Sequence, residues 1–394
     1  MTGTKIPLPR RPRGVTIIEM MVAMVIGMLL MTVIASVLAT SEGTKRTQTG
    51  VNDTSQAGNY AAYIIDQWAR AAGSGFNQTA ARAYGCPLAA NKSGTAILPP
   101  TSSLPAPFAG ISTTVRLTPI LIVPNATTPN VSGQTSDALI IMEGASGGAE
   151  SYTSVTAVPT SSALTVKNTL GYSGDDVILL VDQLTASSNT ATCVIEQVTS
   201  GFSSVTTSLP LSGTYYTSGT TLTGMTDSTV ISNLGNVTNG NPPRFMVVGV
   251  GDNDVLYAYD LLQTNTSPLT AVADGVFEMH AIYGVDTNAD GKVDTWVPAS
   301  SGSYAYSVLT NGTAVSAGLL QNIKAIRLGL ILRSPLKERL DSASKPTTGT
   351  PDSFTFFSGS CTTCTVTRTF TAAEKQYRYR KIEVTIPLRN NLVL

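Results

Sequence analysis

Oxygen-bearing side chains recur at alternate positions in one short, glycine-containing stretch of this chain. The candidate ligand positions are Asp286, Asn288, Asp290, the Lys292 carbonyl and Asp294. Gly291 supplies a sharp turn, and the order matches the first part of a calcium loop, where a hard cation takes about six to eight oxygens. Val297 stands where such a loop usually has a bidentate glutamate, and strands are expected on both sides. We expect either calcium binding of modest affinity or an Asx-rich hairpin turn without a metal.

Four cysteines occur in the chain, and four cysteines allow three disulfide pairings. Cys361 and Cys364 have the spacing of a short bridge across a turn, which leaves Cys86 to pair with Cys193. A zinc site needs further soft ligands, and the chain has a single histidine. A thioredoxin-like redox pair should open a helix, whereas residues 365–370 have the pattern of a strand. The residues therefore favour two disulfides and an oxidising compartment.

One short motif imitates a catalytic site. Residues 144–148, Gly-Ala-Ser-Gly-Gly, match the nucleophile elbow of hydrolases and follow an apolar strand. That elbow requires a helix directly after the serine, and here the pattern continues as loop and strand. The single histidine, His280, lies inside an expected strand and is interpreted as a packed or edge residue. We therefore predict no catalytic residues and no enzymatic activity.

One acid stands at the start of a long apolar run near the N-terminus. Residues 1–14 carry four basic residues and no acid, and Met20–Ala39 contains no charged residue. Roughly 20 apolar residues are enough to cross a bilayer as a helix. Glu19 lies at the start of this run. An ionisable group in a membrane segment costs free energy, so its presence suggests that Glu19 has a function. The leader cations outnumber the Lys45-Arg46 pair beyond the run, which predicts a cytoplasmic N-terminus and a periplasmic bulk.

The composition limits the classes of function. The 394 residues are 42% hydrophobic but only 13% charged, with a formal net charge of zero, and threonine, serine and glycine are abundant. This balance favours strands with polar loops over a helical bundle. No basic patch lies outside the leader, so we expect no direct binding of nucleic acid.

The elements that must position these residues are one long helix and many strands. An apolar stripe at helical spacing runs from Ala61 to Ala72, and Gly73 and Gly75 should end the helix. Residues 43–58 contain three glycines and predict a weak, curved or partly melted helix. The expected strands are Val115–Val123, Ala138–Met142, Val177–Val181, Cys193–Val198, Phe245–Val250, Val255–Leu262, Val276–Tyr283, Ile323–Leu332 and Tyr379–Pro387.

Two polar stretches interrupt this pattern. Residues 127–136 and 206–241 have too little apolar content for a core of their own, so we interpret them as loops or exposed hairpins. A shift in composition near Asn241 suggests a Thr/Ser-rich insertion before a more conventional C-terminal half. Val177–Val181 is apolar at every position, which predicts a central strand.

The N-terminal segment Gly14-Val15-Thr16-Ile17-Ile18-Glu19 resembles the class III signal of type IV prepilins. The resemblance implies that prepilin peptidase cuts after Gly14, so that Val15 becomes the new N-terminus. Glu19 is then the fifth mature residue and is implied to meet the Val15 ammonium group of a neighbouring subunit. The family usually has phenylalanine at the first mature position. The valine here makes efficient N-methylation less expected than it is for the family, and affects the expectation of cleavage less.

Other segments resemble the PilW group of minor type IV pilins. They are residues 66–73, 282–286, 326–334 and 377–390. The resemblance implies an α+β, type IV pilin-like fold, in which a long N-terminal transmembrane helix packs on an antiparallel β-sheet with large β-rich insertions. The expected parts are the leader 1–14, the helix 15–75, with 15–39 in the membrane and 40–75 in the periplasm, and the β-rich domain 76–394.

The implied function is a minor pilin that helps to prime pilus assembly, in a complex at the filament tip. Its partners would be prepilin peptidase, other minor pilins, the major pilin and a tip adhesin, and it would move from the bacterial inner membrane into the pilus. Such filaments serve twitching motility, attachment and DNA uptake. Two alternatives are a J-type pseudopilin of type II secretion and a membrane-anchored adhesin.

Overall fold

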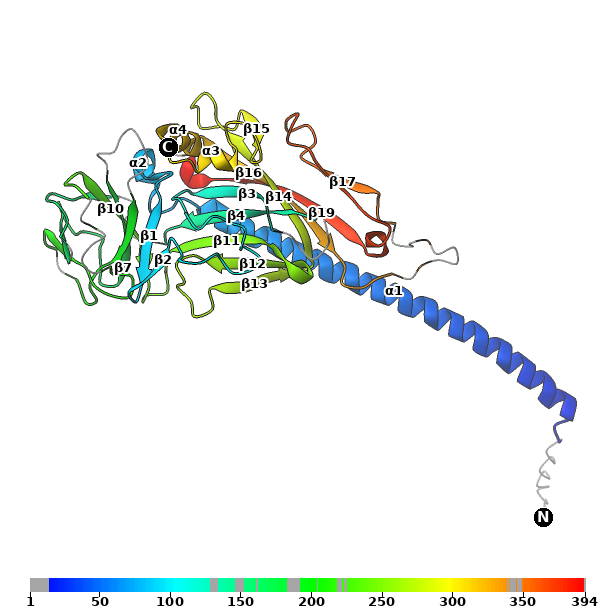
Figure 1. Cartoon of the computed structure of the whole chain (residues 1–394). Helices are drawn as coiled ribbons and strands as arrows, with labels where there is room; N and C mark the ends of the chain where they lie inside the picture. Colours follow the sequence, from blue (N-terminus) through cyan, green and yellow to red (C-terminus); the bar gives the residue numbers. More distant parts are fainter. Residues whose placement is uncertain are drawn as a thin grey trace, which may run out of the picture. The chain divides into compact units, whose positions relative to one another are not determined.

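The computed structural model describes residues 14–127, 134–145, 152–160, 162–182, 192–203, 205–217, 222, 225–338, 340, 345 and 349–392, without the side chains of Arg46 and Arg82. The chain forms two compact units, residues 1–52 and 53–394. The first described element, α1, spans Ile17–Ala71 and contributes residues to both units (Figure 1). The expected α+β architecture is confirmed, because the other long elements are strands in mainly antiparallel sheets.

Helix α1 is continuous over its 55 residues, so residues 43–58 are helical and not melted. Its apolar stripe faces the core of the second unit, where Ala61 and Ile65 are fully buried. Gly58 has a packing role there, since a Cβ atom at this position would lie 1.9 Å from Cδ1 of Leu332. The helix ends as expected before Gly73, whose φ of +83° is a left-handed conformation that glycine adopts without strain.

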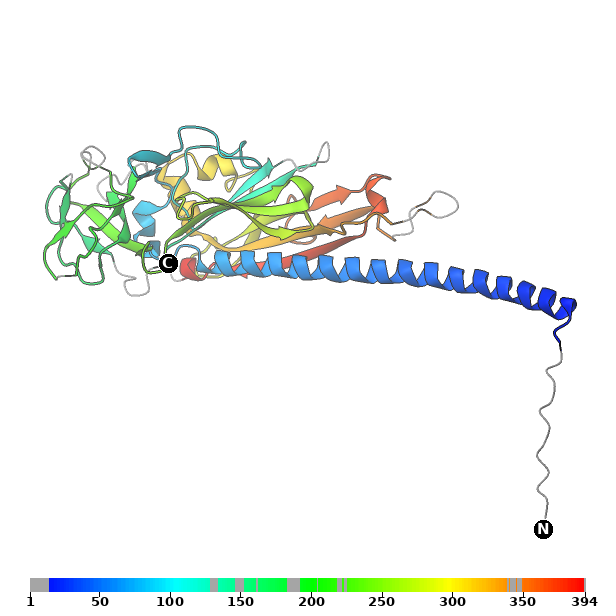
Figure 2. The same cartoon turned by 90° about the horizontal axis from the view of Figure 1, so that it is seen from below.

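The sheet beside the last turns of α1 has the order β15-β14-β16-β19 and is antiparallel throughout (Figure 2). Its strands are β14 (Val276–Val285), β15 (Thr295–Pro298), β16 (Ile323–Arg333) and β19 (Tyr379–Pro387). A five-stranded antiparallel sheet, β13-β12-β11-β4-β3, packs against it through β4 and β14. Its strands are β3 (Ile120–Thr127), β4 (Ser136–Glu143), β11 (Arg244–Gly251), β12 (Val255–Asp260) and β13 (Leu269–Asp274).

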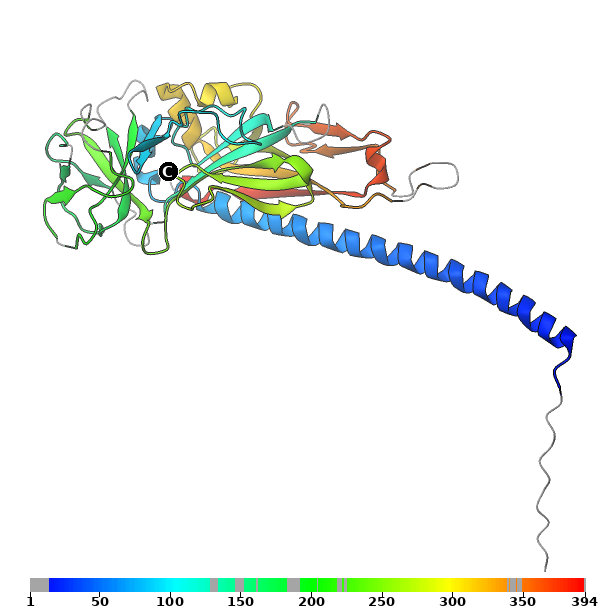
Figure 3. The same cartoon turned by 60° about the horizontal axis from the view of Figure 1, so that its bottom comes forward.

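A third sheet, of six strands in the order β2-β1-β8-β7-β10-β5, gathers at one end of the second unit, where its green strands are visible in Figure 3. Its strands are β1 (Leu88–Lys92), β2 (Thr95–Leu98), β5 (Thr153–Ser154), β7 (Asp176–Asp182), β8 (Cys193–Gln197) and β10 (Thr229–Asn236). Strand β1 runs parallel to β8, and the other pairs are antiparallel. As predicted, β7 is an interior strand.

Strand β7 separates two cores, which explains its unbroken run of apolar residues. Val177 and Leu179 belong to the main core, while Ile178 and Leu180 belong to a second core on the other face. Successive side chains of a strand point to opposite faces, so a strand buried on both faces needs apolar residues at every position.

The interpretation of residues 206–241 as loops or exposed hairpins is wrong for much of this stretch. Leu209 and Met225 lie in the second core, and β10 is buried along its whole length. The polar stretch needs no core of its own, because its few apolar residues complete a core that β7 and β8 begin. Strand β9 (Ser208–Pro210) pairs with β6 (Ala163–Thr165) over this core.

Short elements complete the second unit. They are η1 (Asn77–Thr79), α2 (Ala80–Ala83), η2 (Asp252–Asp254), α3 (Tyr306–Leu309), α4 (Ala314–Gln321), η3 (Glu374–Gln376) and η4 (Arg389–Asn391). A hairpin of β17 (Ser353–Phe356) and β18 (Val366–Thr369) covers β14 and β16 with a small aromatic core that contains Phe277, Phe356 and Phe370. This hairpin includes the strand expected after Cys364.

Candidate functional site

The acid at the N-terminus of α1 caps its own helix. Glu19 Oε2 accepts hydrogen bonds of 3.0 Å from both the backbone N–H and the hydroxyl of Thr16, and the Thr16 hydroxyl accepts a bond of 3.3 Å from the Glu19 N–H. This reciprocal arrangement is a capping box, which satisfies backbone donors that have no partner within the helix. The sequence signal for this cap is the spacing Thr-x-x-Glu at the start of the apolar run.

The helix that follows has an apolar surface on all sides. Its large hydrophobic side chains from Ile17 to Leu38 are exposed, and a window of this helix has a mean hydropathy of 2.6. The helix is therefore long and apolar enough to cross a membrane. Gly14 and Val15 precede it and belong to no helix or strand, and the basic part of the leader, residues 1–13, lies outside the described residues.

The expected calcium loop forms a tight turn between β14 and β15. The carboxylate of Asp286 accepts hydrogen bonds from four backbone N–H groups, those of Asn288, Ala289, Asp290 and Gly291. Burial raises the pKa of Asp286, but these four bonds outweigh it and hold the pKa below its usual range.

Asp294 closes the same turn from its other end. It accepts hydrogen bonds of 2.8 Å from the Thr287 N–H and hydroxyl, and these bonds lower its pKa. Lys292 points an exposed ammonium group toward Asp290 at 3.8 Å. Among the described residues, no three His, Cys, Asp or Glu side chains are grouped as metal ligands would be. The loop therefore holds its shape through its own amides, and calcium binding stays a prediction.

The four cysteines form two disulfides, Cys86–Cys193 and Cys361–Cys364, which is the pairing that the spacing favours. Cys86 lies just before β1 and Cys193 begins β8, so this bridge joins neighbouring strands of the six-stranded sheet. The second bridge closes the loop between β17 and β18. Both bridges restrict the unfolded chain, and the first encloses the longer loop.

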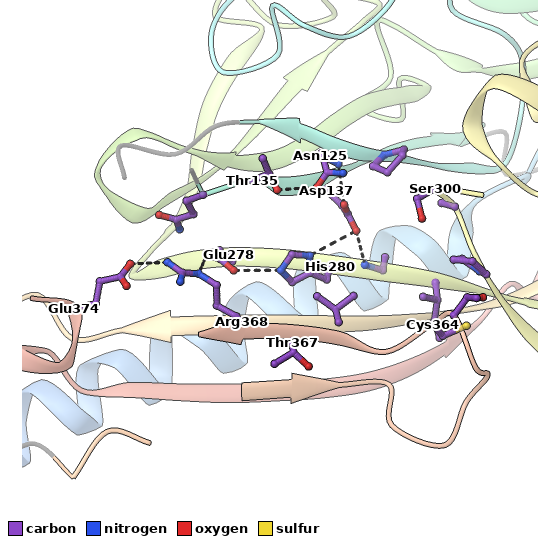
Figure 4. Close-up of a pocket in the computed structure, with 18 of the residues that line it drawn as sticks. Asn125, Thr135, Asp137, Glu278, His280, Ser300, Cys364, Thr367, Arg368 and Glu374 are labelled. Atoms are coloured by element: carbon purple, nitrogen blue, oxygen red, sulfur yellow. Dashed lines mark hydrogen bonds and ion pairs between the residues drawn. The ribbon is translucent and has the colours of Figure 1, made fainter. Parts of the chain in front are cut away.

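The single histidine occupies a polar cavity that the sequence did not reveal. His280 lies on β14, beyond the part that pairs with β15, and only 7% of it is exposed, so it is a packed residue, as the sequence predicts. Its Nε2 atom lies 3.2 Å from Glu278 Oε2 and its Nδ1 atom lies 3.9 Å from Asp137 Oδ2 (Figure 4). The signal for this cluster was an acid and a histidine two residues apart on a strand, which places both side chains on one face.

Asp137 also supports the free part of β14. Its carboxylate accepts hydrogen bonds of 3.0 Å from the Asn125 and Ala281 N–H groups, and Ser136 Oγ accepts one of 2.8 Å from the Met279 N–H. Strand β15 pairs only with Ile282–Val285, so these side chains satisfy amides beyond its reach. Burial raises the pKa of Asp137, although His280 and the two amides act in the opposite direction.

Ser146, the serine of the hydrolase-like motif, lies outside the described residues. His280 meets carboxylates and a phenylalanine ring in its cavity. The described residues form a β-rich unit and a capped apolar helix that is long and apolar enough to cross a membrane.

Two family models match the chain. Residues 238–390 match the type IV pilus-assembly protein W family, and residues 9–35 match the prokaryotic N-terminal methylation motif. The matches confirm the resemblance to PilW and to the class III signal. No curated protein and no solved structure matches the chain.

Proposed function

Because the chain carries an N-terminal methylation motif and a pilus-assembly protein W region, we propose that it is a minor type IV pilin, made as a prepilin. The observation that carries the proposal is the combination of Gly14-Val15 and Glu19 with an apolar helix that continues into the core of a β-rich unit. In this proposal prepilin peptidase cuts between Gly14 and Val15, and helix α1 then anchors the subunit in the inner membrane with its bulk in the periplasm.

Glu19 has the geometry for a second task after cleavage. Both of its capping bonds fall on Oε2, so among the described residues Oε1 is available to another donor. The ammonium group of a neighbouring subunit's N-terminus would supply that donor in a low-dielectric surrounding, where a charge-assisted bond is strong. The proposed pair would set the axial position of the subunit in the filament.

The size of the second unit supports a place at the filament tip. The six-stranded sheet and its second core add a lobe to the two sheets that pack near α1. A lobe of this size would clash with neighbouring subunits if it were enclosed inside a stacked filament. At the end of the filament no subunit lies beyond it, so the lobe can be accommodated there. There the protein would contact other minor pilins, the major pilin and an adhesin, and would prime assembly.

The experiment that tests the proposal is N-terminal mass spectrometry of the mature protein from sheared filaments. The expected mature chain begins at Val15, and the same spectrum reports any N-methylation. A Gly14→Arg variant should remain unprocessed, because a bulky cation replaces the residue before the cut. A mature protein that retains residues 1–14, or that begins after Ala39, would contradict the proposal.

A further inference from the structure

A polar cavity of about 370 Å³ lies between β4, β14 and the hairpin of β17 and β18. Figure 4 shows its labelled side chains converging from these separate elements, with Asp137 above the ring of His280 and Arg368 beside Glu278. The cavity lies within the second unit and is distant in sequence from the N-terminal signal. Pilin cleavage and anchoring do not use it.

Carboxylates outnumber cationic groups in this cavity. Arg368 bridges two of them, with its Nε atom 2.5 Å from Glu278 Oε1 and an Nη atom 2.5 Å from Glu374 Oε1. Asp137 and His280 form the other pair. Even with His280 counted as a cation, the three carboxylates exceed the two cationic groups by one negative charge.

The side chain of Gln134 gives independent evidence, because one of its atoms lacks a hydrogen-bond donor. It lines the cavity, only 3% of it is exposed, and its Nε2 atom donates a hydrogen bond of 2.9 Å to the Phe277 carbonyl. Its Oε1 atom is buried and has no hydrogen-bond partner among the described residues. A buried acceptor without a donor is costly, so this position favours a ligand that donates hydrogen bonds.

A purely structural role for the charges explains only part of this arrangement. The pairs of Arg368 tie the hairpin to β14, which accounts for Glu278 and Glu374. They do not account for the open volume, the excess negative charge or the unpartnered oxygen of Gln134. The excess charge disfavours an anion, and the described carboxylates are not grouped as metal ligands.

We propose that this cavity binds an organic cation the size of a basic side chain, with an ammonium or guanidinium group that donates to Gln134 Oε1 and the carboxylates. A free amine and the arginine or lysine of a protein partner present the same chemistry. The planar donors of a guanidinium match several acceptors at once, so agmatine is the probe of choice.

The test is calorimetric titration of the full chain in detergent micelles. Agmatine represents the free cation, and the blocked tripeptide acetyl-Gly-Arg-Gly-amide represents a basic side chain. Gln134→Leu removes the unpartnered acceptor, and Glu374→Gln removes one negative charge while keeping an acceptor for the Thr371 N–H. Asp352→Asn is the matched control, because it removes a carboxylate with 89% exposure outside the cavity.

Saturable binding of at least one probe to the native chain is expected, and about tenfold weaker binding to Glu374→Gln and to Gln134→Leu. Asp352→Asn should bind like the native chain. Tighter binding of agmatine assigns a free cation, and tighter binding of the peptide assigns a partner's side chain. The proposal is overturned if neither probe binds up to about 10 mM, or if Gln134→Leu, whose folding is checked by circular dichroism, binds like the native chain.

Discussion

Asn390 donates a hydrogen bond of 3.0 Å from its side-chain amide to the carbonyl oxygen of Ala71, at the last residue of helix α1. The same amide donates to the Ala72 carbonyl, and the Asn390 carbonyl accepts a bond of 3.4 Å from Asn77 Nδ2. The last carbonyl groups of a helix have no partner within it. The C-terminal segment therefore satisfies the end of the N-terminal helix and ties the two ends of the fold together.

The first prediction concerns this cap. Asn390→Ala should lower the free energy of unfolding by about 1–2 kcal/mol, because two partly buried carbonyl groups lose their donor. Chemical denaturation of the detergent-solubilised protein measures the change. Asn239→Ala, at an exposed asparagine, should leave the stability nearly unchanged. Equal stability of the two variants would show that the cap contributes nothing.

The second prediction contrasts two glycines of helix α1. Gly58→Ala should destabilise the protein by about 1–3 kcal/mol, because the new methyl group would overlap Leu332 in a packed core. At Gly50 a Cβ atom meets nothing within 4 Å, so Gly50→Ala should stabilise the helix by up to about 1 kcal/mol. Thermal unfolding measures the stability of both variants relative to the native chain. A stabilised Gly58→Ala variant would contradict the packing role of Gly58.

The third prediction is a dependence of stability on pH that arises at Glu196. This side chain is fully buried, and burial raises its pKa from 4.5 to about 7, despite the hydrogen bond it accepts from the Thr217 N–H. As the pH rises from 4.5 to about 7, the unfolded chain loses this proton while the folded chain keeps it. The free energy of unfolding should therefore fall across this range, by about 3 kcal/mol at most.

Denaturation at several pH values tests this dependence. Glu196→Gln should remove most of the decline, because the amide does not ionise and still accepts the bond from Thr217. Asp227→Asn, at an exposed aspartate, should retain the decline. A native protein whose stability rises between pH 5 and 7 by an amount that Glu196→Gln does not alter would refute this role.

The fourth prediction separates the two tasks of Glu19. Glu19→Ala removes both the helix cap and the carboxylate proposed for registration, so incorporation into filaments should be lost. Thr16→Ala weakens the same capping box but keeps the carboxylate, so incorporation should persist. Immunoblots of sheared filaments and of membranes measure the two populations. If both variants fail equally, helix capping and not registration is the requirement.

The fifth prediction concerns calcium at Asp286–Asp294. Calcium should raise the melting temperature of the native chain with an affinity of about 0.1–1 mM, as in extracellular modules with few charged ligands. Asp290→Asn should reduce this rise, and Asp252→Asn, in the short turn of η2, should not. A chelator should lower the melting temperature by the same amount. No response to calcium would assign the loop as a hairpin turn alone.

Local patterns made much of the fold predictable. The expected strands correspond to β3, β4, β7, β8, β11, β12, β14, β16 and β19, each with an apolar run that local propensity explains. The missed strands are short or polar. Strand β10, Thr229–Asn236, alternates polar and apolar residues weakly, and it became a buried strand because β7 supplied a partner and a second core.

The sequence by itself determined the N-terminal signal and the apolar helix, because each depends on residues that are close together in the chain. It also indicated the cysteine pairing, because the short spacing of Cys361 and Cys364 leaves Cys86 to pair with Cys193. Only the tertiary structure decided the cavity around His280, the cap that Asn390 places on α1 and the second core on β7. Those features join residues that are distant in sequence, so their contacts exist only once strand order and register are fixed.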